Sequence, residues 1–441
     1  MRAPPVSTRG VTDFVWRDQV PWREPSAPLR LEDTGRLWGQ FALHRSDGAG
    51  GHVLARDRLG VNKLFFTVTP DGEVLSSSFL FDLLQRGHPV EQVWSVPSGH
   101  AVALSPARGE YRLHRHASLD FGAEAAEPDD VARRIRDTLA ATFERLAAVL
   151  RGRRVFVTLS GGLDSTVVAL LAREHLCAGE LTALTFALRG DTRADAGGDL
   201  GFARVAARAA GAHLEVVSPS PDELVELLDT VLLHGQDWRD FNVHCGLVNA
   251  ALGRWLREQL GDDRGQPPPV LLTGDTMNEL MADYSPVVHR GVEYYGLPRV
   301  PAGRLRRFLV AGLDSGDREV GVLSAFGLDV IQPYALAAEA YAAVPGPQLE
   351  LPLARQELVD RVMGSRVPPA ILARPKVRAQ VGGASAEGGV LAAMVDRGLD
   401  GDRIRRRFAE LYGLEQRQVA RQIRGGLYRF TAEAPWEARA P

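Results

Sequence analysis

Residue types that suit phosphate binding are concentrated in one short segment, Ser160-Gly161-Gly162-Leu163-Asp164-Ser165. The residues before it, 155–159, are rich in β-branched and aromatic side chains and predict a buried parallel strand, while apolar residues at helical spacing follow it. Where a strand, a glycine turn and a helix succeed one another, unpaired backbone N–H groups and the helix dipole favour an anion. The carboxylate of Asp164 would repel phosphate unless a cation lay between them, and Mg²⁺ is the natural bridge. The segment therefore predicts a phosphate loop with magnesium; the alternative is a plain glycine turn of an α/β protein.

A second group of polar residues follows another buried strand, expected at 270–273. Three carboxylates and one amide occur there within nine residues, namely Asp275, Asn278, Glu279 and Asp283. Charged groups are costly to bury unless they face solvent or a cation, so this segment is a second candidate site. The alternative is a polar helix N-terminus whose acidic residues face the helix dipole.

Strands and helices alternate around these two segments, which argues for an α/β fold with a doubly wound parallel sheet. Strands are expected at 155–159, 181–188, 214–218 and 270–273, and helices at 129–150, 202–210, 222–233 and 246–260. In such a sheet ligands bind at the carboxyl ends of the strands, where both polar segments lie. From about residue 304 the sequence is mainly helical, with helices expected at 317–326, 336–344, 355–362, 389–396 and 402–412.

The part of the chain before the sheet has a different pattern. Residues 1–30 carry five prolines and no period, which predicts an irregular arm. A small β-rich domain follows, with strands expected at 38–44, 52–56, 63–68, 73–78 and 100–104. A linker near 123–128 leads to the helix before the sheet, so we predict two domains, residues 1–122 and 123–441.

Composition excludes several classes of protein. The 441 residues carry a net charge of −3 and are 45% apolar, which gives no reason to expect a nucleic-acid or membrane partner. No apolar run approaches the length of a membrane span. Only Cys177 and Cys245 occur, so neither a disulfide framework nor a structural zinc site is expected, and the prediction is a cytoplasmic protein. The arginines between 403 and 424 are interpreted as a solvated helix face.

The segment 160–165 resembles the Ser-Gly-Gly-x-Asp-Ser loop (PP-loop) of the ATP pyrophosphatases, and it lacks the Gly-Lys-Ser/Thr of a Walker A loop. The chain also resembles the asparagine synthetase and β-lactam synthetase superfamily over about residues 37–390. Segments 39–43, 55–66 and 96–100 resemble the later part of the glutaminase domain of asparagine synthetases, and segments 272–284, 317–334 and 373–383 resemble the synthetase domain. The resemblance implies a sheet of the adenine nucleotide α-hydrolase type, a helical C-terminal part and a truncated, β-rich remnant of an Ntn-type domain.

This resemblance implies an ATP-dependent reaction. A carboxylate attacks the α-phosphorus of Mg²⁺-ATP to give an acyl-adenylate and pyrophosphate, and an amine then displaces AMP to form an amide. The nucleotide-binding residues would be Ser160, Gly161, Gly162, Leu163, Asp164, Ser165, Leu184, Thr273, Gly274 and Lys376. Lys376 would also act in catalysis, because an ammonium ion suits an anionic adenylate and oxyanion; an isolated loop lysine would simply be solvated.

Further roles follow from the acidic segments that resemble the family's. Asp275 stands where asparagine synthetases have a glutamate, and Asn278 stands where the family has an aspartate on Mg²⁺. An amide oxygen can ligate Mg²⁺ but brings no charge, so the expected metal residues are Asp164, Asn278 and the neighbouring Glu279. The other catalytic candidates are Asp275 and Glu319. Glu319 could help to deprotonate an attacking amine, and the alternative is an outward-facing helix residue.

Departures from the family shape the expected substrates. Glutaminases of this family use an N-terminal cysteine, whereas Arg2 stands at position 2 and no cysteine precedes Cys177, so no glutaminase activity is expected. Asparagine synthetases have an arginine and an aspartate where Ile331 and Leu336 stand, so the acid is not expected to be aspartate. The expected partners are a small carboxylic acid and an amine, in one molecule or in two. Relatives that also lack the glutaminase include β-lactam synthetases, carbapenam synthetases and lasso-peptide cyclases, which suggests natural-product or antibiotic biosynthesis.

Two alternatives stay open. One is carboxamide formation from free ammonia or from ammonia supplied by a separate glutaminase subunit. The other is a nucleotide-binding or regulatory protein without catalysis, which the change to Asn278 favours and the intact segment 160–165 and Lys376 disfavour. The oligomeric state is also open, with a homodimer as one option.

Overall fold

The computed structural model describes residues 10–24, 26–121, 127–176, 179–190, 198–261, 266–284, 286–296, 298–312, 317–377 and 389–419. At its centre is a five-stranded sheet with the order β13-β12-β11-β14-β17, in which every neighbouring pair is parallel. The strands are β11 (Val155–Thr158), β12 (Leu181–Phe186), β13 (Ala212–Val217), β14 (Val270–Leu272) and β17 (Asp329–Ile331). The chain moves outward from β11 to β13 on one side and from β14 to β17 on the other, so the strand order reverses between β11 and β14. The predicted α/β fold with a doubly wound parallel sheet is confirmed.

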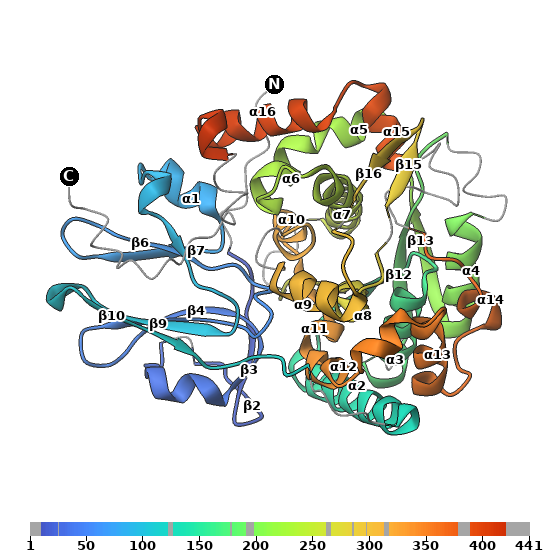
Figure 1. The fold of residues 1–441 in the computed structure, drawn as a ribbon, viewed down its shortest axis with the longest axis horizontal. Helices are drawn as coiled ribbons and strands as arrows, with labels where there is room; N and C mark the ends of the chain where they lie inside the picture. The colour runs from blue at the N-terminus through green and yellow to red at the C-terminus, as the bar shows by residue number, and fades with distance from the viewer. Residues whose placement is uncertain are drawn as a thin grey trace.

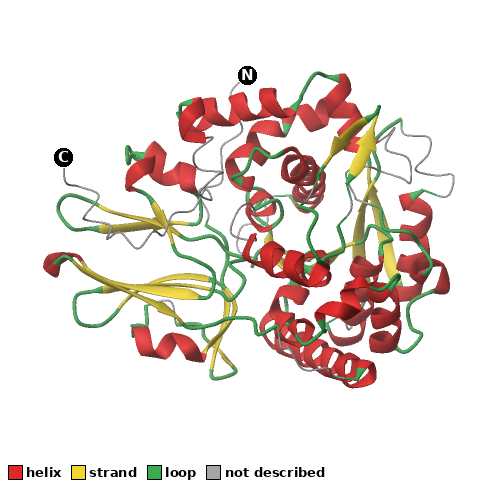
Figure 2. Cartoon of the chain, viewed as in Figure 1, coloured by secondary structure: helices red, strands yellow, loops and turns green. Residues whose placement is uncertain are grey.

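Helices cover both faces of this sheet (Figure 1, Figure 2). On one face lie α3 (Leu163–His175) and α4 (Asp199–Ala210), and on the other lies α7 (Asp240–Leu260), with α6 (Leu228–Gly235) packed against it. The helix α2 (Pro128–Leu150) packs beside α3 and buries the predicted apolar face, which recurs every three or four residues: Val131, Ile135, Leu139, Phe143, Leu146 and Leu150.

The C-terminal part is mainly helical, as predicted. Its helices are α9 (Ala302–Gly312), α10 (Val320–Ser324), α11 (Pro333–Leu336), α12 (Ala338–Ala342), α13 (Ala354–Met363), α14 (Pro369–Leu372), α15 (Gly389–Asp396) and α16 (Gly401–Tyr412). Two short helices complete the sheet domain, α5 (Pro221–Glu226) and α8 (Met277–Met281). None of the described helices has the length and apolar character that crossing a membrane requires.

The N-terminal part is β-rich, as predicted. Its described residues form antiparallel sheets with the orders β2-β1-β3, β10-β9-β5-β4 and β7-β6-β8. The strands are β1 (Phe14–Arg17), β2 (Val20–Pro21), β3 (Leu37–Gln40), β4 (Ala42–Ser46), β5 (His52–Arg56), β6 (Phe65–Val68), β7 (Val74–Ser77), β8 (Trp94–Ser95), β9 (His100–Ser105) and β10 (Glu110–Arg115), and the helix α1 (Leu80–Gln85) follows β7. Figure 1 shows this part beside the five-stranded sheet and its helices.

Two sequence predictions for this part are wrong. Residues 14–17 and 20–21 form strands rather than an irregular arm, because β1 pairs with β3, a partner remote in sequence that local periodicity does not reveal. The strand expected at 38–44 is two strands, β3 and β4, in different sheets. The break falls at Phe41, whose carbonyl accepts from Asp57 N–H at 2.9 Å and whose N–H donates to the Asp57 carboxylate at 3.2 Å. Residue 41 is thus bonded to a turn instead of to a neighbouring strand.

Several boundaries in the sheet domain also differ from prediction. The helix expected at 222–233 is two helices, α5 and α6, which meet at Leu227, where the N–H bonds to the carbonyl three residues back. The helix expected at 317–326 begins only at Val320, because Asp317 N–H donates at 2.8 Å to the carbonyl of Gly235. The helix expected at 336–344 is replaced by α11 and α12, which meet at Ala337. The strand β17 and the hairpin of β15 (Val287–His289) and β16 (Val292–Tyr294) were not predicted, since three residues are too few to show a period.

One apolar core joins the N-terminal part to the sheet domain. Phe79 and Phe81 at α1 pack against His234 of α6, with ring centroids 4.8 and 5.2 Å apart. The ring of Phe81 also lies 6.5 Å from that of Tyr412 at the end of α16. The first part of the chain therefore packs against its last described helix. The predicted boundary between residues 122 and 123 lies outside the described residues, so the division into two domains stays a prediction.

Candidate active site

The segment 160–165 forms a tight loop between β11 and α3, as predicted. The N–H and the hydroxyl of Ser160 each lie 3.2 Å from the Ser165 hydroxyl, and Gly162 N–H donates to the Ser160 hydroxyl at 3.3 Å. These contacts fold the loop onto the first turn of α3, whose N-cap is Gly162. The loop and this helix N-terminus line one cleft, together with the predicted Leu163. Backbone N–H groups, hydroxyls and a helix N-terminus that share one cleft are the arrangement that binds phosphate.

Two glycines allow three backbone segments to approach one another at this loop. Gly161 has φ +70°, and a Cβ there would lie 2.3 Å from Ala203 N and 2.5 Å from the carbonyl carbon of Phe202 in α4. Gly274 follows β14, and a Cβ there would lie 2.8 Å from Ser165 N. No larger residue fits at such distances. Gly161 and Gly274, both predicted to bind nucleotide, hold the loop, α4 and the end of β14 together by close packing.

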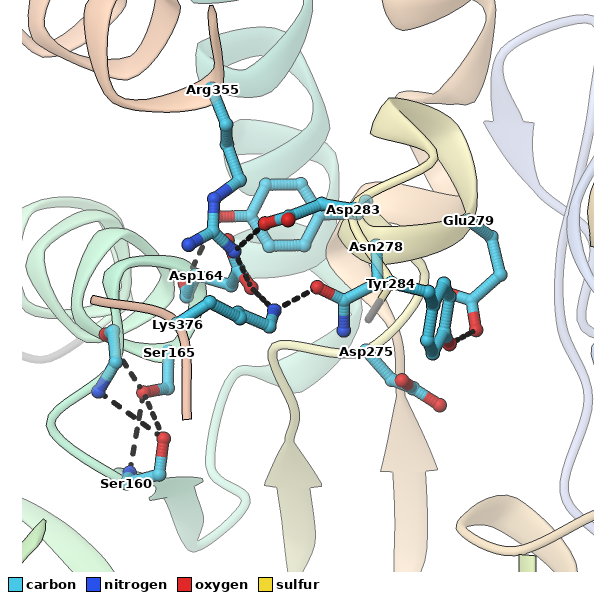
Figure 3. A network of polar contacts seen from close by, with 12 residues as sticks. Ser160, Asp164, Ser165, Asp275, Asn278, Glu279, Asp283, Tyr284, Arg355 and Lys376 are labelled. Atoms are coloured by element: carbon cyan, nitrogen blue, oxygen red, sulfur yellow. Dashed lines mark hydrogen bonds and ion pairs between the residues drawn. The ribbon is translucent and has the colours of Figure 1, made fainter. Parts of the chain in front are cut away.

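Lys376, predicted to bind the nucleotide and to act in catalysis, reaches the phosphate loop. Its Nζ lies 3.3 Å from Oδ2 of Asp164 and contacts Oδ1 of Asn278 (Figure 3). The two oxygens come from different elements, α3 and α8, and both residues line the cleft. A positive charge is thus accommodated between a carboxylate and an amide oxygen, and hard oxygen donors are the ligands that Mg²⁺ prefers. Asp164 and Asn278 therefore fit a magnesium ion beside the phosphate loop.

Glu279, the third residue predicted for the metal, lies in a different cluster. Its carboxylate accepts from the Tyr284 hydroxyl and, at 3.0 Å, from Arg318, on the far side of Asn278 from Lys376 (Figure 3). Among the described residues, no group of three or more His, Cys, Asp or Glu side chains is placed to hold a metal ion. A magnesium ion would therefore take its remaining ligands from phosphates and water, as this ion usually does. The metal role of Glu279 stays a prediction.

Two arginines beside the phosphate loop were not predicted. Arg355, in α13, is 6% exposed and bridges two carboxylates, Asp164 at 3.2 Å and Asp283 at 2.8 Å (Figure 3). Arg374 donates to the carbonyl of Ser160 at 3.2 Å. With Lys376 they place three cationic side chains at the mouth of the phosphate loop. In the sequence both arginines sit in ordinary helix and loop contexts, so only their packing reveals them.

The opposite wall of the cleft is acidic. Arg318 Nη2 lies 2.8 and 3.0 Å from the two carboxylate oxygens of Asp275 and 3.0 Å from Glu279. Burial raises the pKa of the Glu279 carboxyl, and the charge of Asp275 raises it further. One guanidinium thus faces two carboxylates, and Glu319 adds a third carboxyl group to the same wall. Asp275 lines the cleft as predicted, in contact with an arginine that was not predicted as a site residue.

Glu319 faces the cleft rather than solvent. It precedes α10, and its Oε2 accepts from the Thr273 hydroxyl at 2.6 Å and from the Gln332 amide at 3.0 Å. Burial, with the nearby charge of Asp275, raises the pKa of the Glu319 carboxyl to about 8. A carboxylate with a pKa near the working pH is suited to accept a proton. Thr273, predicted beside the nucleotide, is fully buried and holds this carboxylate.

An apolar side completes the cleft. One face of α7 supplies it, with residues at helical spacing: Phe241, Cys245, Val248, Asn249 and Leu252. The predicted Leu184, in β12, also lines the cleft. Burial raises the pKa of the Cys245 thiol to about 12, so the thiol stays protonated. The cleft between these walls is partly open to solvent and has a cavity volume of about 200 Å³.

Comparison with known proteins relates part of this architecture to one family. Residues 134–316 match the family model described as asparagine synthase. They form an asparagine synthase-like segment. The segment contains the phosphate loop, Asp275, Asn278 and Glu279, whereas Glu319 and Lys376 lie beyond it. No curated protein matches the chain.

Two solved structures are similar at low identity. The NMN synthetase from Francisella tularensis is 13% identical with a TM-score of 0.32, covering 71% of this chain and 92% of that one. The NAD+ synthetase from Burkholderia pseudomallei is 17% identical with a TM-score of 0.22, covering 57% of this chain and 94% of that one. TM-scores this low carry no conclusion about the function of this chain.

Proposed function

We propose that the protein is an ATP-dependent carbon–nitrogen ligase that forms AMP and pyrophosphate, adenylating a carboxylate and transferring the acyl group to an amine. The observation that carries the proposal is the position of Lys376, whose Nζ lies between Asp164 and Asn278 at the mouth of the phosphate loop. A cation there faces the phosphates of a bound nucleotide and the oxyanion of an acyl group attached to them. The match of residues 134–316 to the asparagine synthase family supports the same reaction class.

The phosphate end of the cleft serves the first step. The loop 160–165 binds the triphosphate through its N–H and hydroxyl groups, and Arg355, Arg374 and Lys376 neutralise its charge. Asp164 and Asn278 would hold Mg²⁺ in the place that the Lys376 ammonium takes here, and the ion would supply positive charge to the phosphate oxygens beside Lys376. A carboxylate oxygen of the substrate attacks the α-phosphorus, the bond to the β-phosphate oxygen breaks, and pyrophosphate leaves.

The acidic wall serves the second step. Asp275 and Glu319 line this wall, and a single arginine, Arg318, contacts both Asp275 and Glu279, so a cationic amine is attracted to this wall. Glu319 takes a proton from the amine, the amine nitrogen attacks the acyl carbon, and AMP leaves as the amide forms. Holding both partners in one cleft supplies proximity, and excluding water protects the adenylate from hydrolysis.

The source of the amine belongs to the same proposal. We infer that the protein has no glutaminase activity of its own and takes an amine from the substrate or from a second small molecule, in a natural-product pathway of the cytoplasm. Arg2, on which the first inference rests, lies outside the described residues. Ammonia as the nucleophile is the alternative, and added ammonium would then replace the amine in the assay.

The experiment measures pyrophosphate and AMP from Mg²⁺-ATP in the presence of pooled carboxylic acids. Asp164→Ala should abolish acid-dependent pyrophosphate release, whereas Asp222→Ala, which removes an aspartate that is 83% exposed, should leave it unchanged. Formation of ADP and phosphate would refute the mechanism. Tight ATP binding without turnover across the acid pool would favour the nucleotide-binding protein instead.

A further inference from the structure

A buried glutamine of the N-terminal part forms hydrogen bonds with the last strand of the central sheet and the residue after it. Gln40, the last residue of β3, is 1% exposed. Its amide nitrogen donates to the carbonyl of Val330 at 2.8 Å, and its amide oxygen accepts from Gln332 N–H at 3.1 Å. The same nitrogen lies 3.1 Å from Oδ1 of Asn62, which orients the amide. Gln40 thus completes the backbone hydrogen bonds of the chain as it leaves β17.

The residue that Gln40 holds is in contact with the candidate base. The Gln332 side chain donates to Oε2 of Glu319 at 3.0 Å, and its oxygen accepts from the Thr276 hydroxyl at 2.9 Å. A continuous chain of contacts therefore runs from Gln40 through the backbone and side chain of Gln332 to the carboxylate of Glu319. Gln40, Thr276 and Gln332 are all buried.

The N-terminal part also faces the other end of the segment that carries Glu319. Asp317 is 5% exposed, and its carboxylate accepts from Gly321 N–H at 2.6 Å. Burial raises the pKa of Asp317 to about 6, and the positive charge of Lys63 in the N-terminal part opposes that rise. Glu319 is thus flanked on both sides by residues that meet the N-terminal part.

We propose that Gln40 is a positioning residue for Glu319, acting through Gln332, so that the N-terminal part shapes the acyl-transfer end of the active site. The inference deepens the proposed function and rests on it. Removing the Gln40 amide leaves a buried carbonyl and a buried N–H without their partner, so the chain after β17 shifts to satisfy them. Gln332 moves with its backbone, and its hydrogen bond to Glu319 is lost. The phosphate loop itself lies on β11 and α3 and meets this segment two residues after Gln332, where the Tyr334 hydroxyl donates to the Asp164 carbonyl at 2.9 Å, so adenylation is expected to persist as long as that hydrogen bond is kept.

The test compares Gln40→Met with a matched control, Gln236→Met. Gln236 is also a 1% exposed glutamine at this interface, donating to the carbonyl of Ser78 at 3.0 Å and accepting from Leu80 N–H at 2.7 Å. Gln40→Met should lower amide formation about tenfold to a hundredfold and leave acid-dependent pyrophosphate exchange within about twofold of wild type. Gln236→Met should change neither the rate of amide formation nor the rate of pyrophosphate exchange, whatever it does to the stability of the protein. Equal loss of both half-reactions in Gln40→Met would overturn the proposal.

A second readout does not require turnover. In protein labelled with carboxyl-¹³C glutamate, the Glu319 resonance, assigned with Glu319→Gln, should titrate near pH 8 in the wild type. The Gln332 hydrogen bond favours the ionised form, so Gln40→Met and Gln332→Met should each raise this pKa, and the double variant should raise it no further than either alone. The charged or titratable groups that face Glu319 are Asp275, Arg318 and Cys245, and all are kept. An unchanged titration in Gln40→Met would overturn the proposal. If Gln40→Met raised the pKa of Glu319 but Glu319→Gln kept full activity, Gln40 would still position Glu319. Glu319 would then not be the base of the proposed function.

Discussion

Replacing Gly161 by alanine tests whether the phosphate loop depends on close packing against α4. A residue with a Cβ at φ +70° costs about 1–2 kcal/mol in backbone strain. The same Cβ would lie 2.3 Å from Ala203 N, so backbone must move by about 1 Å, and overpacking of this kind costs about 1–3 kcal/mol. The loop or α4 is therefore expected to shift, at a total cost of about 2–5 kcal/mol.

The control separates strain from the clash. Gly211, the C-cap of the same helix, has φ +58°, but a Cβ there would meet only Arg173 Nε at 3.7 Å. Gly211→Ala should thus show the strain alone, about 1–2 kcal/mol, with unchanged affinity for Mg²⁺-ATP. In Gly161→Ala, the displaced loop must return to its native position before Mg²⁺-ATP can bind. If that return costs about 3 kcal/mol, the Kd for Mg²⁺-ATP rises roughly a hundredfold.

Calorimetric titration with Mg²⁺-ATP and thermal unfolding followed by circular dichroism measure the two effects. The expected result is a weak Kd and a low thermal midpoint for Gly161→Ala, against a native Kd and a smaller loss of midpoint for Gly211→Ala. If Gly161→Ala had the wild-type Kd for Mg²⁺-ATP and the same thermal midpoint as Gly211→Ala, the packing of the loop on α4 would not govern nucleotide binding.

Three further predictions concern side chains of the cleft. Glu319→Gln should lower amide formation about a hundredfold while pyrophosphate exchange persists, and wild-type amide formation should rise with pH up to about 8, because only the ionised carboxyl accepts a proton; a rate that is flat from about pH 6 to 9 would contradict this. Lys376→Met, which keeps the length and removes the charge, should lower both half-reactions about a hundredfold, with partial recovery in Lys376→Arg, and activity equal to wild type in Lys376→Met would exclude a role for the ammonium. In a Cys177→Ser background, Cys245, a half-buried residue of the cleft, should react with iodoacetamide at pH 8 far more slowly than after denaturation, since burial raises its pKa to about 12. Rapid labelling of the native protein, seen by mass spectrometry, would be inconsistent with this raised pKa.

Local sequence was sufficient wherever an element is defined by its own neighbours. The strand before Ser160, the glycine turn and the helix after it were predicted because periodicity and turn chemistry are local properties. The apolar face of α2 was predicted for the same reason. By contrast, β1 exists because of its pairing with β3, and β17 is a strand because β14 lies beside it, so neither shows a signal of its own.

The sequence indicated the candidate site in part: residues in recognisable segments were proposed, and residues defined only by three-dimensional packing were missed. Lys376 and Asn278 were proposed through resemblance to a family, and the structure places them in contact at the cleft, while their roles stay predictions. Arg355 and Arg318 were missed as site residues because an arginine in a helix or turn is usually solvated, and only three-dimensional packing shows which carboxylates it meets. Glu279 was predicted by adjacency to Asn278, and its metal role stays a prediction. Neighbouring residues of one helix turn point in different directions, and the Glu279 carboxylate contacts Arg318 and Tyr284.

The contact between α1 and α16 has a consequence for how the protein is made. Phe81 packs on Phe79 and on His234 of α6, but its contact with Tyr412 forms only when that residue, more than three hundred residues later, has been synthesised. At about 5–20 residues per second, a ribosome needs roughly 15–65 s to cover that interval, during which this part of the surface of α1 lacks its partner. The N-terminal strands can pair early, yet burial of their apolar edge waits for the C-terminal helices. Yield in a cell should therefore respond to chaperone supply during translation.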